Sequence, residues 1–257
     1  MRQALTDNNQ ELLKRKNMSI ILIVIFIGLL GIWIMSSYFD FKLIWFIMFW
    51  VLSILIILEN KKNITKHNII IGIILGILSI PSNLIMGVST IITFVAAMSI
   101  YNKSKNKIIF FRSGKKNVLA TLFIILITGV LLGTLNVYLA MDTMVINISF
   151  KLKWILDALR AGITEEVLFR FFFFAICIKV TRDNKLNKFQ IFMCYLIMII
   201  PHTLIHFDFT NFSIGNVVAL SLLFGLPFTI LQMKRDLFSA IGSHALVNLI
   251  RFIIFGM

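Results

Sequence analysis

Two adjacent glutamates, Glu165 and Glu166, lie in the middle of a long apolar segment. An ionisable side chain at membrane depth costs about 2.5–3.5 kcal/mol on insertion scales, and it usually faces a polar interior or a water-filled cavity. The chain has only 11 acidic residues, so two of them at this place indicate a functional site. The chemistry that a positioned carboxylate supports best is general acid–base catalysis.

Helical spacing gives the two glutamates different surroundings. Residues four apart share a helix face, so Glu166 can pair with Arg170. Glu165 is turned by about 100° from Glu166, and no cation follows it three or four residues later. We therefore expect Glu165 to face a cavity while Arg170 holds Glu166. For Glu166 and Arg170, a purely structural ion pair is the alternative.

Three of the four histidines, His202, His206 and His244, lie within or next to apolar segments of the last hundred residues. His202 and His206 are one helical turn apart, and so are His244 and Asn248. The second pair can donate to a developing oxyanion or hold a water. A hydrogen bond between helices is the alternative for a single intramembrane histidine.

Apolar segments must position these side chains. They cover residues 18–36, 43–58, 68–101, 117–140, 153–180, 189–206, 214–232 and 237–255. Because basic residues flank 68–101 on both sides, we expect this stretch to cross twice, with a turn at Pro81, Ser82 and Asn83. The fold class is therefore all-α, a polytopic membrane helical bundle of about 8–9 transmembrane helices.

Composition supports a membrane protein, since 59% of the 257 residues are hydrophobic. The net charge of +14 comes from residues in short loops, chiefly in 1–17, 59–67, 102–116 and 179–188. That pattern indicates orientation in a lipid bilayer rather than binding to nucleic acid. We expect a multi-pass protein of the cell membrane with a cytoplasmic N-terminus and with 102–116 and 179–188 on the same side. Both cysteines lie in apolar segments, so no disulfide framework is predicted.

Three motifs resemble those of a known family. Glu165-Glu166-Val-Leu-Phe-Arg170 is similar to the EExxxR motif of the CPBP intramembrane peptidases, the Abi family, which includes the type II CAAX prenyl endopeptidases. His244-Ala-Leu-Val-Asn248 is similar to their HxxxN motif. The chain departs from the family's FxxxH motif. The residue four before His206 is His202, and the residue four before His202 is Met198, so neither histidine has the phenylalanine of the motif.

The resemblance covers about residues 153–255, so we expect two regions. Residues 1–150 would form an N-terminal transmembrane region of about five helices, and 151–257 a CPBP-like catalytic core of four helices. The spacing between motifs favours His206 as the working histidine, with His202 in a supporting hydrogen bond. The depth of each residue in the membrane, counted along its helix, favours His202 instead. However, helix tilt changes such depths by several ångströms.

The resemblance implies an intramembrane endopeptidase. Glu165 would activate water beside Glu166 and Arg170, His206 would help to hold that water, and His244 and Asn248 would stabilise the oxyanion. No cofactor is needed for this chemistry. The competing interpretation is zinc bound by His202, His206, His244 and Glu165. The segment from His202 to His206 lacks the glutamate of HExxH, and no cysteine ligand is at hand, so the metal-independent mechanism is favoured.

Two other classes of function stay open. One is a non-catalytic member of this fold that binds and regulates a membrane partner, which the imperfect second motif permits. The other is a transporter with a proton relay, which is disfavoured because residues 1–150 contain no matching acidic site. The expected substrate is a peptide or protein delivered in or at the membrane. The Ile, Lys and Asn content is typical of a bacterial protein.

Overall fold

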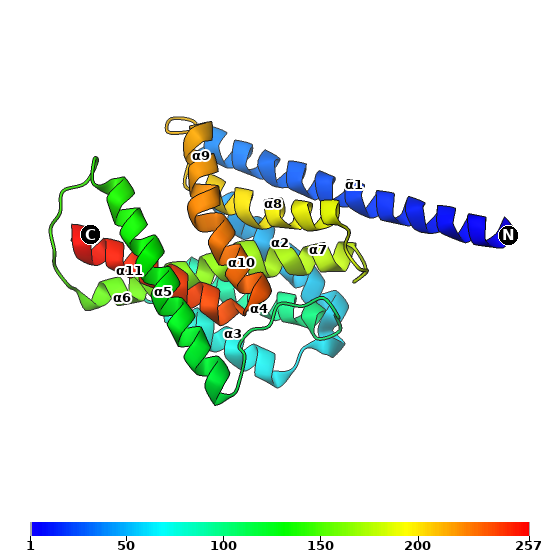
Figure 1. The fold of residues 1–257 in the computed structure, drawn as a ribbon, viewed down its shortest axis with the longest axis horizontal. Helices are drawn as coiled ribbons and strands as arrows, with labels where there is room; N and C mark the ends of the chain where they lie inside the picture. Colours follow the sequence, from blue (N-terminus) through cyan, green and yellow to red (C-terminus); the bar gives the residue numbers. More distant parts are fainter. Residues whose placement is uncertain (1, 257) are drawn as a thin grey trace.

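The computed structural model describes residues 2–256, in which all regular secondary structure is helical. The elements are α1 (Arg2–Tyr38), α2 (Leu43–Asn60), the 3₁₀ turn η1 (Lys61–Asn63), α3 (Lys66–Ser79), α4 (Leu84–Tyr101), α5 (Lys115–Ala140), α6 (Leu152–Glu165), the π-helix η2 (Glu166–Phe172), α7 (Phe173–Val180), α8 (Lys188–Leu204), α9 (Ile214–Leu220), the π-helix η3 (Ser221–Gly225), α10 (Leu226–Lys234) and α11 (Leu237–Phe255). Since η2 joins α6 to α7 and η3 joins α9 to α10, these residues form nine continuous helices. The predicted all-α bundle is confirmed (Figure 1).

Six helices are long and apolar enough to cross a membrane. They are Lys16–Tyr38, Leu43–Asn63, Leu84–Tyr101, Lys115–Ala140, Ile214–Lys234 and Leu237–Phe255. Two shorter apolar helices, Lys66–Ser79 and Lys188–Leu204, complement them. The chain is therefore a multi-pass membrane protein.

The predicted turn inside residues 68–101 is confirmed. Helix α3 ends at Ser79, and α4 begins at Leu84, where the Asn83 side chain accepts a hydrogen bond from the Met86 backbone N–H at 3.0 Å. The two helices approach closely because Gly76 faces Gly87. A Cβ on Gly76 would lie 2.9 Å from the Gly87 carbonyl oxygen.

Helix α1 begins earlier than predicted. Residues 1–17 were expected to form a loop before the apolar segment, but the helix starts at Arg2. Gln, Glu, Lys and Arg favour the helix without being apolar, so hydropathy alone detects only the membrane part. In Figure 1 this end of α1 extends beyond the other helices, while α8 runs alongside the rest of α1.

The basic loops lie together at one end of the bundle. The Asp183 carboxylate accepts hydrogen bonds from the Lys105 and Asn106 backbone N–H groups at 2.6 and 3.0 Å. Arg112 donates to the Arg235 carbonyl at 2.8 Å. The predicted common side of 102–116 and 179–188 is thereby confirmed. Loop 205–213 lies at the other end, close to the C-terminal part of α1.

Aromatic packing fixes the helix that carries the two glutamates. Every residue of η2 is buried. Phe49 of α2 contacts Phe169 edge to face at 5.2 Å between ring centroids, and Phe94 of α4 stacks on Phe171 at 5.5 Å. The Tyr101 hydroxyl donates to the Phe171 carbonyl at 2.7 Å. The phenylalanines of this segment therefore belong to the core.

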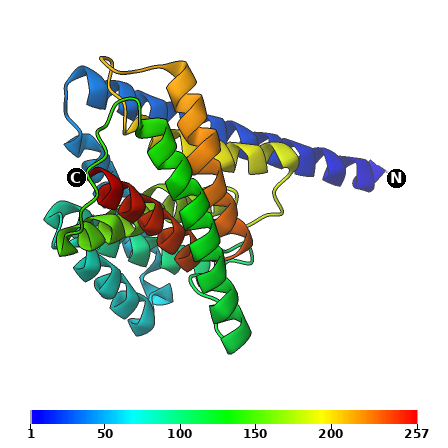
Figure 2. The ribbon, with the colours of Figure 1, turned by 60° about the vertical axis from the view of Figure 1, so that its left-hand side comes forward.

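Glycine contacts bring α11 against both α5 and α6. A Cβ on Gly162 would lie 2.7 Å from the Ile241 carbonyl oxygen, so α6 and α11 touch backbone to backbone. Gly129 of α5 faces the side chain of Leu246, and a Cβ there would lie 2.5 Å from it. Figure 2 shows α5, in green, crossing α11, in red. The Gly162 contact lies one turn before Glu166 and brings His244 within reach of it.

Candidate active site

The structure brings the predicted site residues of three helical segments together. Glu165, Glu166 and Arg170 come from the α6–η2 helix, His202 and His206 from the end of α8, and His244 and Asn248 from α11. Hydrogen bonds or short contacts connect all of them except Asn248, which lines the same cavity as His244.

The helix that carries this site is not a regular α-helix. The sequence pattern predicts one α-helix over 153–180, but Glu166–Phe172 is π-helical. A π-helix inserts a residue into the helical repeat and turns the side chains that follow it, and it occurs frequently at functional sites. The Tyr101 hydroxyl bonded to the Phe171 carbonyl satisfies one backbone group of this segment.

Glu166 and Arg170 form the predicted ion pair, and both side chains are fully buried. Glu166 Oε1 accepts hydrogen bonds from Arg170 Nη1 at 2.5 Å and from His244 Nδ1 at 2.8 Å. Breaking a buried pair by removing one partner typically costs about 3–5 kcal/mol, because it leaves an uncompensated charge. Glu166 is thus committed to holding Arg170 and His244.

Arg170 connects η2 to two further helices. Its Nε donates to Thr229 Oγ1 at 3.1 Å, and its Nη2 approaches the Gly225 carbonyl at 3.5 Å. The same Nη2 lies 3.1 Å from Nδ1 of His202. Gly225 ends the second π-helical segment, η3, so Arg170 joins the two π-helical segments of the described chain.

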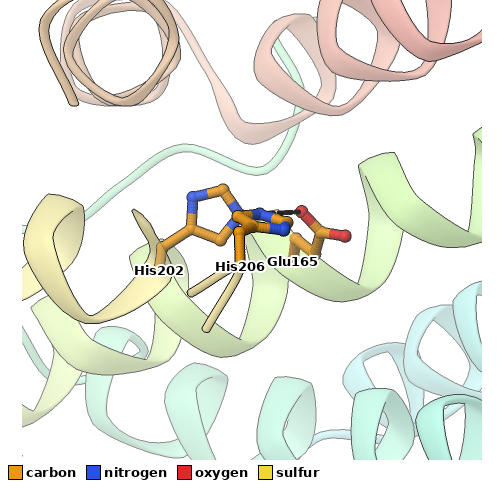
Figure 3. Close-up of side chains that lie close together, drawn as sticks. All are labelled: Glu165, His202 and His206. Carbon is orange, nitrogen blue, oxygen red and sulfur yellow. Dashed lines mark hydrogen bonds and ion pairs between the residues drawn. The ribbon is translucent and has the colours of Figure 1, made fainter. Parts of the chain in front are cut away.

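The contact with Arg170 fixes the tautomer of His202. A guanidinium has only donors, so Nδ1 of His202 must be the acceptor in this contact. The proton of the neutral ring then lies on Nε2, which donates to Glu165 Oε2 at 2.7 Å. Figure 3 shows this bond as a dashed line to the Glu165 carboxylate. His202 therefore orients Glu165 and is itself oriented by Arg170.

His244 lies between the two glutamates. Because the Glu166 carboxylate only accepts, Nδ1 of His244 carries a proton and donates to it. Its Nε2 lies 3.6 Å from Glu165 Oε2. The ring stacks on Phe228 with centroids 4.8 Å apart, which holds its plane. His244 can therefore direct Nε2 towards a group bound near Glu165.

His206 faces the same carboxylate from farther away. Its Nε2 lies 3.9 Å from Glu165 Oε2, too long for a hydrogen bond but short enough for both groups to share a water. The side chain is 48% exposed, the most accessible of the three histidines. Helix α8 ends at Leu204, two residues before the predicted end, so His206 lies in the following turn.

Two cavities meet at Glu165 and His206, the two residues that line both of them. The apolar cavity, of about 270 Å³, is walled mainly by Trp33, Trp45, Phe46, Phe49, Leu168 and Phe169. The polar cavity, of about 250 Å³, includes Asn136, His202, His244, Asn248 and Arg251. A peptide bond at this junction would have an apolar pocket on one side and a polar pocket on the other.

The histidines differ in whether their hydrogen-bond partners suit a zinc ligand. Ligand atoms of Glu165, His202 and His206 lie within 4.8 Å of one another. However, a zinc-binding imidazole usually donates its other N–H to a carboxylate, a carbonyl or water. His202 instead presents that nitrogen to the Arg170 guanidinium, which cannot accept. His244 fits, since its Nδ1 donates to Glu166. The predicted four-ligand set therefore does not fit zinc as a whole.

Several residues of the site were not predicted from the sequence. Arg251 and Asn136 line the polar cavity, Thr229 holds Arg170, and Trp33 and Trp45 wall the apolar cavity. Arg251 could have been found, because it follows His244 by seven residues and so shares its helix face. The tryptophans belong to helices that resemble generic membrane segments, and only their packing reveals them.

Comparison with protein families gives one match. Residues 147–250 match the family model described as Type II CAAX prenyl endopeptidase Rce1-like. This region contains all of the predicted site residues, from Glu165 to Asn248, and the resemblance drawn from the motifs is confirmed. Neither curated proteins nor solved structures gave a match.

Proposed function

We propose that this chain, whose residues 147–250 belong to the type II CAAX prenyl endopeptidase Rce1-like family, hydrolyses peptide bonds inside the membrane with Glu165 as the general base. One observation carries the proposal. Glu165 is the carboxylate at the junction of the two cavities, and three histidines surround it. Its neighbour Glu166 lines neither cavity.

The attacking water binds between Glu165 and His206. Their separation of 3.9 Å allows one water to bond to both groups, and the hydrogen bond from His202 fixes the carboxylate. Glu165 removes a proton from this water as it attacks the peptide carbonyl, and later returns the proton to the leaving amine. General acid–base catalysis of this kind contributes about 10²–10⁴-fold.

His244 and Asn248 stabilise the oxyanion from the polar cavity. The Nδ1–H of His244 stays on Glu166 Oε1 at 2.8 Å, and its Nε2 points towards Glu165, 3.6 Å from Oε2, where the oxyanion forms. The Asn248 amide, one turn further along α11, adds a second donor. No metal is required for these steps.

The substrate enters from the end of the bundle opposite the basic loops. Asp40, Lys42 and Asp208, from the loops at that end, line the apolar cavity. With the N-terminus in the cytoplasm, this is the outer side of the membrane. Residues 1–150 then supply walls of the apolar cavity, and 151–257 supply the catalytic groups.

Cysteine labelling tests this orientation. A membrane-impermeant maleimide added to intact cells should label Ser213→Cys, in the exposed loop 205–213, and leave Lys105→Cys unlabelled until the cells are permeabilised. The native Cys177 and Cys194 are buried and give a low background. Ready labelling of Lys105→Cys from outside would reverse the orientation.

The proteolytic function is tested by comparing peptides in membranes that contain wild type or Glu165→Gln at equal protein levels. Asp157→Asn is the matched control, because Asp157 lies on the same helix but pairs with Lys153 at 2.8 Å, away from the site. Cleavage products should be present with wild type and the control, and absent with Glu165→Gln. A Glu165→Gln protein with full biological effect would favour a non-catalytic partner-binding role.

A further inference from the structure

A pocket of about 190 Å³ lies among the basic loops and shares no residue with the two cavities at Glu165. It is built where α2, α4 and α7 end. The charged residues that line it are Glu59, Lys103, Lys179, Arg182 and Asp183. Because three cations stand against two carboxylates, the pocket has one net positive charge, and the proposed function gives it no role.

Both carboxylates of this pocket already have partners. Glu59 forms an ion pair with Lys179. Asp183 accepts hydrogen bonds from the Lys105 and Asn106 backbone N–H groups at 2.6 and 3.0 Å. The Asn106 side chain donates to the same carboxylate at 3.0 Å. Neither carboxylate is therefore left to balance the other two cations.

Those two cations, Lys103 and Arg182, are exposed, and their side chains form no hydrogen bond or ion pair with residues 16–256. Cations near helix C-termini often bond to the last carbonyl groups. Here loop backbone takes that place. The Arg182 N–H bonds to the Lys179 carbonyl at 3.1 Å, and the Lys103 N–H bonds to the Ile100 carbonyl at 3.2 Å. Both side chains are thus available to an anion.

An apolar cavity of about 400 Å³ adjoins the pocket, and Glu59 and Lys179 line both. Its other walls are apolar residues of α1, α2, α7 and α8. It reaches Leu52, seven residues before Glu59 on α2, which is a rise of about 10.5 Å. Leu55 on its wall is 58% exposed on a membrane-crossing helix, so the cavity is open to lipid.

This pair of cavities has the chemistry that an anionic phospholipid requires. A guanidinium binds phosphate through two parallel N–H···O bonds, and basic pockets between membrane helices bind phospholipid headgroups. A lipid tail gains little by leaving a bilayer that is already apolar, so charge decides which lipid is preferred. We infer that Arg182 and Lys103 bind the phosphate of an anionic phospholipid, while the apolar cavity holds one of its acyl chains.

Lipid titration of the purified full-length protein, followed by native mass spectrometry, tests this site. The probes are dioleoyl phosphatidylglycerol, dioleoyl phosphatidylcholine and glycerol 3-phosphate, which carries the phosphate without the chains. Each Lys or Arg near an anionic lipid strengthens binding about fivefold, so two should make wild type bind phosphatidylglycerol about 25-fold more tightly than phosphatidylcholine. Glycerol 3-phosphate should bind more weakly than phosphatidylglycerol.

A charge variant assigns the preference to the pocket. Lys103→Gln/Arg182→Gln should bind the two dioleoyl lipids equally. Lys105→Gln/Lys185→Gln is the matched control, since it removes two exposed cations from the same two loops, and neither lines the pocket or the apolar cavity. This control should keep the wild-type preference.

A second pair of variants tests the acyl chain. Leu55→Trp fills part of the apolar cavity and should weaken phosphatidylglycerol binding. Leu58→Trp is its control, because Leu58 is 64% exposed on the same helix and lines neither cavity. Equal binding by these two variants would overturn the placement of the chain.

Other results would overturn the lipid site as a whole. They are equal binding of both lipids to wild type, a preference that survives in folded Lys103→Gln/Arg182→Gln, and glycerol 3-phosphate binding as tightly as phosphatidylglycerol. Displacement of the lipid by hexaglutamate would indicate an acidic protein partner instead. Because these variants change no residue of the proposed active site, each result leaves the proteolytic function standing.

Discussion

The two adjacent glutamates occupy different kinds of surroundings. Glu166 is fully buried and bonded to Arg170 and His244, and through Arg170 it is tied to α8 and α10. Glu165 is held by one hydrogen bond from His202 and faces two cavities. One turn of helix thus provides a closed side that sets geometry and an open side that can react. Two neighbouring residues with the same side chain can therefore differ in role, since Glu166 holds the geometry of the site and Glu165 is open to a substrate.

The largest effect on the fold is expected at the closed side. Arg170→Met should lower the free energy of unfolding by about 3–5 kcal/mol, because Glu166 would stay buried without its cation. Denaturant unfolding of the protein in detergent measures this loss. Arg170→Met/Glu166→Gln should recover part of it, since no buried charge is then left unpaired. A change below about 1 kcal/mol in the single variant would mean that the pair behaves as an exposed one.

Substitution of His206 and of His202 should lower the cleavage rate to different extents. His206→Ala should lower the cleavage rate by at least about 10²-fold, because in the proposed mechanism His206, at the cavity junction, holds the attacking water. His202→Ala should be milder, about tenfold, the effect of losing one hydrogen bond to a charged group. Cleavage rates of the two purified variants measure this ranking. A reversed ranking would move the water site to His202.

A smaller effect is expected where α6 meets α11. In Gly162→Ala the new methyl group would lie 2.7 Å from the Ile241 carbonyl, so α11 must shift and take His244 away from Glu166. We expect a loss of about 1–3 kcal/mol in stability, as for overpacking elsewhere, together with reduced activity. Gly28→Ala is the control, because nothing lies within 4 Å of its added Cβ. Equal behaviour of the two variants would show that this contact does not position the site.

No effect is expected from metal removal. Exhaustive chelation should leave the cleavage rate unchanged, because the proposed proton transfer by Glu165 and donation by His244 need no metal. Activity that is lost with a chelator and restored by zinc would contradict this. Glu165, His206 and His244 would then be the ligands to test, since Arg170 blocks His202.

Local spacing was enough to predict part of the site. The Glu166–Arg170 pair follows from a separation of four residues, and the turn before α4 follows from Pro81 with its polar neighbours. The shared cavity of His244 and Asn248 follows from their common helix face. These predictions succeeded because each depends on one helix and its loops.

Features that depend on several helices could not be predicted in this way. The residues of the π-helical segment Glu166–Phe172 have an apolar pattern like that of an α-helix, so the sequence pattern cannot distinguish the two kinds of helix. The contact of Arg170 with His202 and the tryptophan wall of the apolar cavity arise from packing between distant segments. The early start of α1 was missed because the membrane pattern records hydropathy and not helix propensity.

The most direct test of the division between the two glutamates is a paired measurement on purified Glu165→Gln and Glu166→Gln. Cleavage rate and thermal unfolding are measured on the same preparations. Glu165→Gln should unfold like wild type and lose about 10²–10⁴-fold in rate. Glu166→Gln should unfold at a lower temperature, with activity falling as the fold weakens. A Glu165→Gln protein that still cleaves at the wild-type rate would contradict the assignment of Glu165 as the general base.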